Sequence, residues 1–269
     1  MLYEGDHVID GATHFLQTLV DLGVKFCLLT NNSTATLEQL AAKMAKIGLP
    51  QLTEARILTS AYEAVAIVKP KCAYIVGMDG LYDACRSAGV IIANGEDDKV
   101  RDGCSVDCVL VGLDRNITYT KLSMAMECIG KGASFVATNT DPQFPMKDCL
   151  RPGAGAIVAA VETCTGRKPI VVGKPEKNLF LSAAKHFNVT DMARVVMVGD
   201  RIDTDVMGGN GVGMPTVLMQ TGIGKTYAQH MLDSLAGREK PTVVVRDMHA
   251  LTALVAAARG GAAAAANKK

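Results

Sequence analysis

One stretch decides the fold class: residues 195–205 have the sequence Val-Val-Met-Val-Gly-Asp-Arg-Ile-Asp-Thr-Asp. The apolar residues 195–198 predict a buried strand, because short aliphatic runs bounded by turn residues are typical of parallel sheets. Three carboxylates, Asp200, Asp203 and Asp205, follow within six residues. Turn and capping chemistry accounts for one such carboxylate but not for three. Carboxylates beyond a strand end suit Mg²⁺, so the stretch indicates a metal site on a parallel sheet.

Buried strands and amphipathic helices alternate on both sides of this stretch. The expected strands are residues 26–29, 73–76, 108–111, 134–137, 170–172, 195–198, 216–219 and 242–245. The expected helices lie around residues 12–20, 37–47, 81–87, 119–129, 156–164, 179–187 and 227–232, with a last one from residue 248. This alternation predicts a parallel sheet covered by helices on both faces, which is the α/β class.

The alternation restarts at about Cys72 with different loop composition, and it changes again after Gly166. We therefore expect a doubly wound parallel-sheet core, residues 1–70 and 167–269, that is interrupted by an inserted α/β domain, residues 71–166. The low-complexity tail, residues 260–269, is expected to fray.

Composition excludes several classes of protein. The 269 residues include 28 Lys+Arg and 27 Asp+Glu, a balance that gives no electrostatic reason to expect nucleic acid or an anionic membrane as a partner. Apolar residues at 49% exclude disorder over most of the chain, and no apolar run reaches the roughly 20 residues of a membrane span. The eight cysteines form no C-x-x-C pair, so we expect reduced thiols in a soluble, cytoplasmic protein.

Two more strand ends carry polar residues. Thr30, Asn31 and Asn32 follow the strand at 26–29 and offer a hydroxyl and amides at a helix N-terminus, which suits an anion. A plain helix N-cap is the alternative interpretation. Lys174 lies in a Gly-Lys-Pro loop between a strand and a helix, and a solvated surface lysine is the alternative there. Because ligands bind beyond the carboxyl ends of parallel strands, these residues are candidate binding residues.

Two glycine-rich patterns point to nucleotide binding only weakly. Residues 208–213 do not match the dinucleotide spacing G-x-G-x-x-G in any register. Residues 221–226, Thr-Gly-Ile-Gly-Lys-Thr, end like a P-loop, but a P-loop needs glycine where this chain has Met219. A P-loop nucleotide-binding protein is therefore a remote alternative.

The order of the polar clusters is more specific than any one of them. Thr-Asn-Asn at 30–32, Gly-Lys-Pro at 173–175 and Gly-Asp-Arg-Ile-Asp-Thr-Asp at 199–205 together resemble the haloacid dehalogenase superfamily. The chain is similar to its p-nitrophenylphosphatase/phosphoglycolate phosphatase family, in which a large α/β cap separates the second and third motifs. The phrases Gly-Leu-Asp-Arg-Asn at 112–116 and Pro-Gly-Ala-Gly-Ala at 152–156 also resemble that family.

The resemblance implies an enzyme that hydrolyses small phosphate monoesters, such as p-nitrophenyl phosphate or phosphoglycolate-like compounds, through an aspartyl-phosphate with Mg²⁺ as cofactor. By resemblance, Thr30 and the amides of Asn31 and Asn32 hold the phosphoryl oxygens, and Lys174 neutralises charge on the transferred group. Asp200 is implied to bind the metal. Asp205 is implied to order the metal site without binding the metal itself.

The chain departs from the family in one respect. The family's first motif, D-x-D-G, supplies the nucleophile and the general acid/base, and no D-x-D-G occurs in the 269 residues. We expect that the first, central strand of the core is missing through N-terminal truncation, so that the nucleophile is absent and this chain is inactive. The alternative is a non-catalytic binding or regulatory protein built on the phosphatase scaffold.

The resemblance also bears on substrate and assembly. Relatives that select pyridoxal phosphate place a histidine before a proline of the cap, where this chain has Phe144 before Pro145. We therefore favour a phosphoglycolate-like or broad-range enzyme. Relatives pair through the cap, which implies a homodimer.

Overall fold

The computed structural model describes residues 1–145 and 149–266 and divides into two compact units. The unit that we name terminal comprises Met1–Leu28, Ala41–Arg56 and Ala183–Lys269, and the unit that we name central comprises Leu29–Leu40 and Ile57–Ser182. These segments group residues by compactness. The expected division into a core, 1–70 with 167–269, and an inserted domain, 71–166, stays a prediction.

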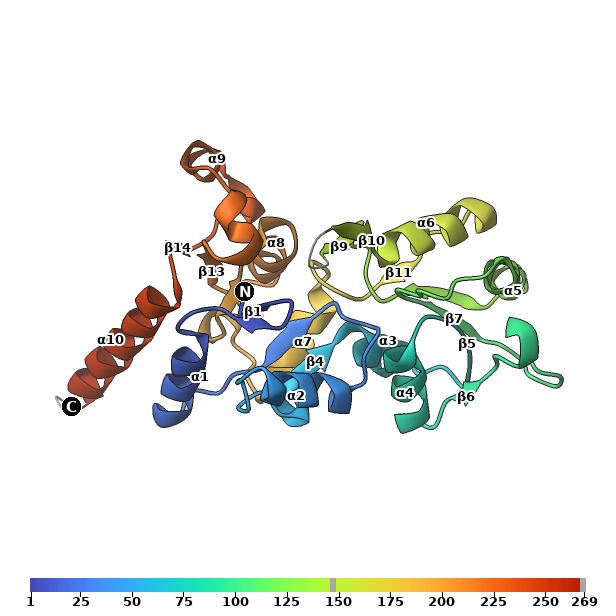
Figure 1. Ribbon diagram of the computed structural model, residues 1–269, viewed down its shortest axis with the longest axis horizontal. Coiled ribbons are helices and arrows are strands. Elements are labelled where there is room, and N and C mark those ends of the chain that lie inside the picture. Colours follow the sequence, from blue (N-terminus) through green and yellow to red (C-terminus); the bar gives the residue numbers. More distant parts are fainter. Residues whose placement is uncertain (146–148, 267–269) are drawn as a thin grey trace. The chain divides into compact units, whose positions relative to one another are not determined.

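A five-stranded parallel sheet forms the middle of the central unit, with strand order β11-β8-β7-β5-β6 (Figure 1). Its strands are β5 (Cys72–Val76), β6 (Ile91–Ile92), β7 (Cys108–Val111), β8 (Ser134–Ala137) and β11 (Ile170–Val171). Parallel neighbours require crossover connections, and these contain helices α4 (Asp79–Ser87), α5 (Tyr119–Gly130) and α6 (Ala154–Thr165). The predicted α/β class is confirmed.

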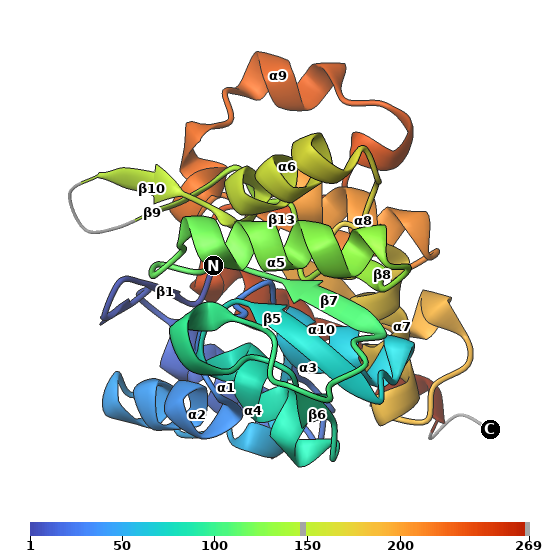
Figure 2. The same cartoon turned by 90° about the vertical axis from the view of Figure 1, so that its right-hand side faces the viewer.

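Helices cover both faces of this sheet. Successive side chains of a strand point to opposite faces, so Val109 packs with α5 and α6 residues in one apolar cluster, whereas Leu110 packs with α3 and α4 residues in another. Figure 2 shows α5 and α6 on one side of β5 and β7, and α3 (Ser60–Val68) and α4 on the other. Every residue of β5 and β7 is buried, which explains their continuous apolar sequences.

Short elements complete the central unit. Strands β3 (Leu28–Thr30, of which Leu28 belongs to the terminal unit) and β4 (Ile57–Thr59) pair with each other, and β9 (Gln143–Pro145) and β10 (Leu150–Pro152) form an antiparallel hairpin. Helices α2 (Leu37–Lys46) and α7 (Lys177–His186) each contain residues of both units.

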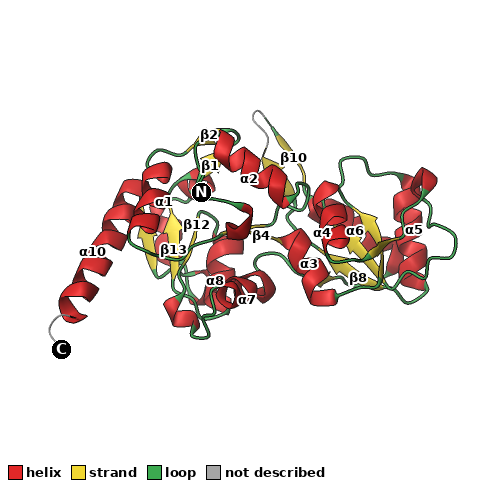
Figure 3. Ribbon diagram, turned by 90° about the horizontal axis from the view of Figure 1, so that it is seen from below, coloured by secondary structure: helices red, strands yellow, loops and turns green. Residues whose placement is uncertain are grey.

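The terminal unit is built on a three-stranded parallel sheet, β12-β13-β14. Its strands are β12 (Met197–Gly199), β13 (Thr216–Met219) and β14 (Val243–Val245). Its other elements are the antiparallel pair β1 (Tyr3–Glu4) and β2 (His7–Val8), and helices α1 (Ala12–Asp21), α8 (Met207–Gly211), α9 (Gln229–Ser234) and α10 (Met248–Ala266). Helices α1 and α10 pack side by side (Figure 3).

Two sequence expectations concern the ends of elements. The strand expected at 195–198 starts later in the structure, because β12 begins at Met197. The Val195 N–H donates to the Met192 carbonyl and closes a 3-10 turn before the strand. The tail expected to fray includes the last residues of α10, and residues 267–269 lie outside the described residues. None of the helices within the described ranges is both long and apolar enough to cross a bilayer.

Candidate active site

The residues predicted for the site fall into two groups, one in each unit. Thr30, Asn31, Asn32 and Lys174 belong to the central unit, and Asp200 and Asp205 belong to the terminal unit. We call residues 30–32 the Thr-Asn-Asn loop and residues 199–205 the acidic loop.

The Thr-Asn-Asn loop is shaped by Asn32. Its side-chain oxygen Oδ1 accepts hydrogen bonds from the Thr34 N–H at 2.9 Å and from the Ala35 N–H at 3.3 Å, so Asn32 closes a turn ahead of α2. The Asn32 N–H donates to Thr30 Oγ1 at 3.1 Å. Thr30 therefore accepts a bond, while its own hydroxyl proton has no acceptor among the described residues. That proton is available for a phosphate oxygen.

The Asn31 carboxamide binds the main chain of Lys174. Oδ1 of Asn31 accepts from the Lys174 N–H at 2.8 Å, and Nδ2 donates to the Lys174 carbonyl at 3.0 Å. Nδ2 also donates to Oδ2 of Asp141 at 3.1 Å. Both carboxamide oxygens of the loop thus have protein partners, and so has Nδ2 of Asn31. The role of Asn31 and Asn32 as phosphate donors stays a prediction, and for Asn31 it does not rest on the side-chain N–H groups, both of which have protein acceptors.

Lys174 reaches the carboxyl end of β3. Its Nζ donates to the Leu29 carbonyl at 3.3 Å, next to Thr30 in the chain. A hydroxyl donor and an ammonium group are thereby held near the same strand end. This pairing suits a phosphoryl group, because hydrogen bonds between a cation and an anion are among the stronger ones in proteins.

In the terminal unit, the acidic loop and the turn that it contacts each follow one of two neighbouring parallel strands. Asp200 follows β12, and the turn at Thr221–Ile223 follows the neighbouring strand β13. The Ile223 N–H donates to Oδ2 of Asp200 at 3.1 Å, and the amino nitrogen of Met1 lies 3.3 Å from the same oxygen. Oδ1 of Asp200 has no hydrogen bond or ion pair within the described chain. One carboxylate oxygen is thus uncommitted.

The other two acidic residues of the loop have partners nearby. Asp205 is buried, and its Oδ2 accepts from the Arg201 N–H at 3.2 Å, which ties the start of the loop to its end. Asp203 pairs with the Arg201 guanidinium, with Nε 3.0 Å from Oδ1. These hydrogen bonds to Arg201 hold the pKa of Asp203 below its usual range.

A magnesium ion fits the acidic loop only in part. Among the residues that the structure describes, no three or more His, Cys, Asp or Glu side chains gather around one point. Mg²⁺ does not need such a cluster, since it is typically bound by one or two carboxylates together with waters and phosphate oxygens. Oδ1 of Asp200 fits that role. The predicted metal roles of Asp200 and Asp205 stay predictions.

Comparisons with known proteins agree with these features. A family model described as haloacid dehalogenase-like hydrolase matches residues 1–91, and a second model of HAD-like hydrolases matches residues 171–251. The 5'-nucleotidase YutF of Bacillus subtilis is 35% identical over 244 residues, which is 90% of each chain. The chain belongs to the haloacid dehalogenase-like hydrolases.

Solved structures place this hydrolase within the p-nitrophenylphosphatase-like family. A double mutant of the thermostable NPPase from Geobacillus stearothermophilus matches with a TM-score of 0.77 and 33% identity, over 89% of this chain and 91% of that one. The glycerol phosphate phosphatase Rv1692 of Mycobacterium tuberculosis, solved in complex with magnesium, matches with a TM-score of 0.80 and 28% identity, over 93% of this chain and 73% of that one. By family the protein is a phosphoric monoester hydrolase.

The glycine-rich segment at 221–226 has a different role from a P-loop in this hydrolase. Residues Gly222–Thr226 form a 3-10 turn, and its Ile223 N–H bonds the Asp200 carboxylate. A phosphate-cradling loop directs such N–H groups toward a bound anion. The remote P-loop alternative is therefore not supported.

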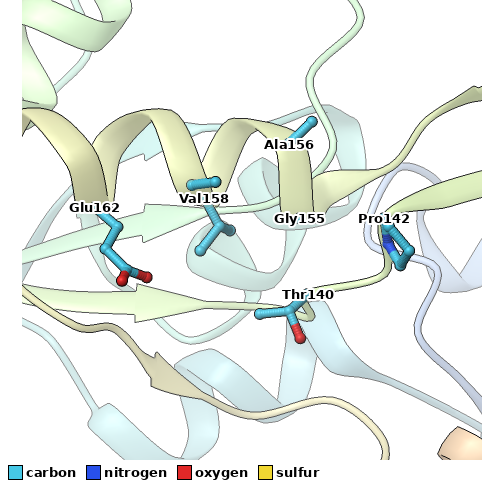
Figure 4. A pocket seen from close by; sticks show the side chains of 7 residues that line it. Thr140, Pro142, Gly155, Ala156, Val158 and Glu162 are labelled. Carbon is cyan, nitrogen blue, oxygen red and sulfur yellow. The ribbon is translucent and has the colours of Figure 1, made fainter.

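A shallow hollow of about 380 Å³ lies beside the first turns of α6 in the central unit (Figure 4). It is lined by Thr140, Pro142, Gly155, Ala156, Val158, Ala159 and Glu162. Its only charged lining residue, Glu162, forms an ion pair with Lys168. No sequence pattern indicates this hollow, because α6 and the segment at 140–142 each look like ordinary structure when taken alone.

Proposed function

We propose that this hydrolase is a Mg²⁺-dependent phosphatase that cleaves small phosphate monoesters through an aspartyl-phosphate. The observation that carries the proposal is the shared position of the Thr30 hydroxyl and the Lys174 ammonium at the end of β3. The uncommitted Oδ1 of Asp200 supports the metal part of the proposal. The names of the relatives, a nucleotidase and two phosphatases, support the reaction class.

Each residue has a distinct task in this proposal. The Thr30 hydroxyl donates to a phosphoryl oxygen and orients the group, while Lys174 offsets its negative charge. Asp200 holds Mg²⁺, which when bound supplies further charge neutralisation to the phosphoryl group. Asp205 and Arg201 keep the acidic loop in shape through their hydrogen bond. The nucleophile is an aspartate of a D-x-D-G motif, which the 269 residues do not contain.

The test compares two proteins in hydrolysis of p-nitrophenyl phosphate. One is the 269-residue chain, and the other is the same chain preceded by the D-x-D-G strand of a p-nitrophenylphosphatase relative. We expect no turnover by the first, and turnover by the second that EDTA abolishes and Mg²⁺ restores. An extended protein that folds but does not hydrolyse the ester would end the proposal in favour of a non-catalytic binding protein. Turnover by the 269-residue chain would overturn the assignment of the nucleophile.

Two variants of the extended protein separate chemistry from folding. Replacement of the first aspartate of D-x-D-G by asparagine removes the nucleophile with little change of shape, so turnover should fall to background. Lys174→Ala should lower kcat/KM by at least about a hundredfold, because charge neutralisation of a transferred phosphoryl group contributes several kcal/mol. An active Lys174→Ala variant would show that the loop at the end of β3 is not the phosphate site.

The substrate class is a further part of the proposal. Phe144 precedes Pro145 at the end of β9, and we infer a phosphoglycolate-like or broad-range preference rather than selection of pyridoxal phosphate. A panel of phosphoglycolate, glycerol phosphate, nucleoside monophosphates and pyridoxal phosphate tests this with the extended protein. A kcat/KM for pyridoxal phosphate more than tenfold above all the others would contradict it.

A further inference from the structure

A chain of contacts in the central unit connects Asp141, a residue with no expected catalytic role, through Asn31 to Lys174. It begins at Asp141, whose backbone is held on both sides: its N–H donates to Asn139 Oδ1 at 3.1 Å, and its carbonyl accepts from the Gly155 N–H at 3.0 Å. A Cβ on Gly155 would lie 2.5 Å from the Thr140 carbonyl, so only glycine allows this approach. Figure 4 shows Gly155 on the first turn of α6, beside Thr140 and Pro142.

The Asp141 carboxylate then determines how the Asn31 carboxamide lies. A primary amide has two N–H donors, and in Asn31 both are used, one by Asp141 at 3.1 Å and one by the Lys174 carbonyl at 3.0 Å. The remaining amide atom, Oδ1, accepts from the Lys174 N–H at 2.8 Å. A flipped amide would turn Oδ1 toward two acceptors, so Asp141 and Lys174 together admit a single orientation.

The main chain of Asn31 is held by the same segment. Its carbonyl accepts from Asn139 Nδ2 at 2.9 Å and from Ser60 Oγ at 3.0 Å. Asn139 is itself buried, so these contacts are shielded from water. Side chain and backbone of Asn31 are both fixed, and they in turn hold both polar groups of the Lys174 backbone.

We propose that Asp141 is a positioning residue: through Asn31 it holds Lys174 in the position from which Lys174 binds phosphate. The first turn of α6 holds Asp141 in place. The inference rests on the proposed phosphate-binding role of Lys174. It assigns a function to the Thr-Asn-Thr-Asp and Pro-Gly-Ala-Gly phrases, at 138–141 and 152–155, which supply Asp141 and the Gly155 N–H that holds it.

The sign of a charge effect makes the inference testable. A carboxylate near a bound phosphate repels it. If Asp141 only lay near the phosphate and had no positioning role, its removal would therefore raise the phosphate affinity. If Asp141 positions Lys174, its removal should lower the phosphate affinity. Asp141→Asn separates the two effects, because an amide oxygen at position 141 can still accept from Asn31 Nδ2 without the charge.

The experiment measures binding of inorganic phosphate to the 269-residue chain by isothermal titration calorimetry at low ionic strength. We expect Asp141→Ala to weaken binding about five- to tenfold, and Asp141→Asn to bind as tightly as the unchanged chain or up to about twofold more tightly. The matched control is Asp102→Asn, which removes an exposed carboxylate of the same unit and should give at most the small gain of a distant charge. Equal or tighter binding by Asp141→Ala would overturn the inference.

Lys174→Ala distinguishes failure of this inference from failure of the proposed function. If Lys174→Ala leaves phosphate binding unchanged, the phosphate site itself is wrong, and the inference falls with it. If Lys174→Ala weakens binding while Asp141→Ala does not, only the positioning role is refuted.

A second variant covers the case in which Asp141→Ala does not fold. Asn31→Asp keeps the size of the side chain and the acceptor for the Lys174 N–H, but it replaces both Nδ2 donors with an oxygen that faces Asp141 and the Lys174 carbonyl. We expect weaker phosphate binding, and a partial recovery of at least threefold when Asp141→Asn is added. Addition of Asp102→Asn should give no such recovery. Equal recovery by the two second substitutions would overturn the inference, because charge alone would then explain it.

Discussion

Replacement of Gly222 by alanine should lower the unfolding free energy by more than backbone strain alone, because it also displaces the Asp200 carboxylate. Gly222 has φ +52, in the left-handed region, where an alanine costs about 1–2 kcal/mol. A Cβ there would also lie 2.2 Å from Asp200 Oδ2, against ordinary contact distances of 3.4–4 Å. The carboxylate must therefore shift, and we expect this shift to break its hydrogen bond with the Ile223 N–H. Loss of that charged hydrogen bond costs about 1.5–3 kcal/mol more.

Gly237 offers a matched control for this substitution. It lies in the same unit with φ +55, and a Cβ there has nothing within 4 Å. Gly237→Ala should thus show the backbone strain alone, about 1–2 kcal/mol, while Gly222→Ala should lose about 2.5–5 kcal/mol in total. Urea unfolding of the 269-residue chain, followed by circular dichroism, measures both free energies.

A second readout connects the same pair of variants to the metal. In the protein extended with D-x-D-G, Gly222→Ala should raise the Mg²⁺ concentration for half-maximal activity by at least about tenfold, because Asp200 is displaced, whereas Gly237→Ala should not change it. The reasoning is refuted if the two variants differ by less than about 0.5 kcal/mol in unfolding free energy and bind Mg²⁺ alike.

Three shorter predictions follow from other contacts. Asp114→Ala should lower the unfolding free energy by about 3 kcal/mol, measured in urea, because it leaves the Lys121 ammonium, 2.8 Å from the buried Asp114 carboxylate, without its nearest partner. Thr30→Val, which keeps the shape and removes the hydroxyl, should weaken phosphate binding about tenfold in calorimetry. The lowered pKa of Asp203 means that its pairing with Arg201 stabilises the fold above the unfolded pKa of about 3.9 and that this contribution is lost as pH falls through the lower folded pKa. In thermal melts, Asp203→Asn should therefore be less stable than the unchanged chain at pH 6, by a small margin because Asp203 is well exposed, and the two should converge only when the pH falls below the lowered folded pKa of Asp203.

The parallel sheet of the central unit could be predicted from the sequence because its strands are buried on both faces. The runs at Cys108–Val111 and Ser134–Ala137 are apolar throughout or nearly so, and no amphipathic helix has that pattern. Edge strands were harder to place. Val196 is 54% exposed and belongs to the predicted strand, yet β12 begins only after it, since apolar character does not reveal where a turn ends.

Candidate site residues could be named from motif order, but their partners could not. Asn31 and Asp141 are 110 positions apart, and no local pattern connects an asparagine after one strand with an aspartate after another. Asn31 and Asn32 look equivalent in the sequence. The structure gives them different tasks, since one closes a local turn and the other binds a distant main chain. Only tertiary contacts decide which donor is left for a ligand.

The groups that remain unpaired are the most informative feature of both loops. Buried or half-buried polar groups are nearly always paired, because a missing hydrogen bond costs about 1–3 kcal/mol. In the acidic loop, Arg201 binds Asp203 with its side chain and Asp205 with its N–H, whereas Oδ1 of Asp200 has no partner among the residues that the structure describes. In the Thr-Asn-Asn loop the Thr30 hydroxyl proton likewise has no acceptor among the described residues. The Asp200 oxygen is an acceptor suited to a cation and the Thr30 hydroxyl is a donor suited to an anion, and phosphoryl transfer needs groups of both kinds.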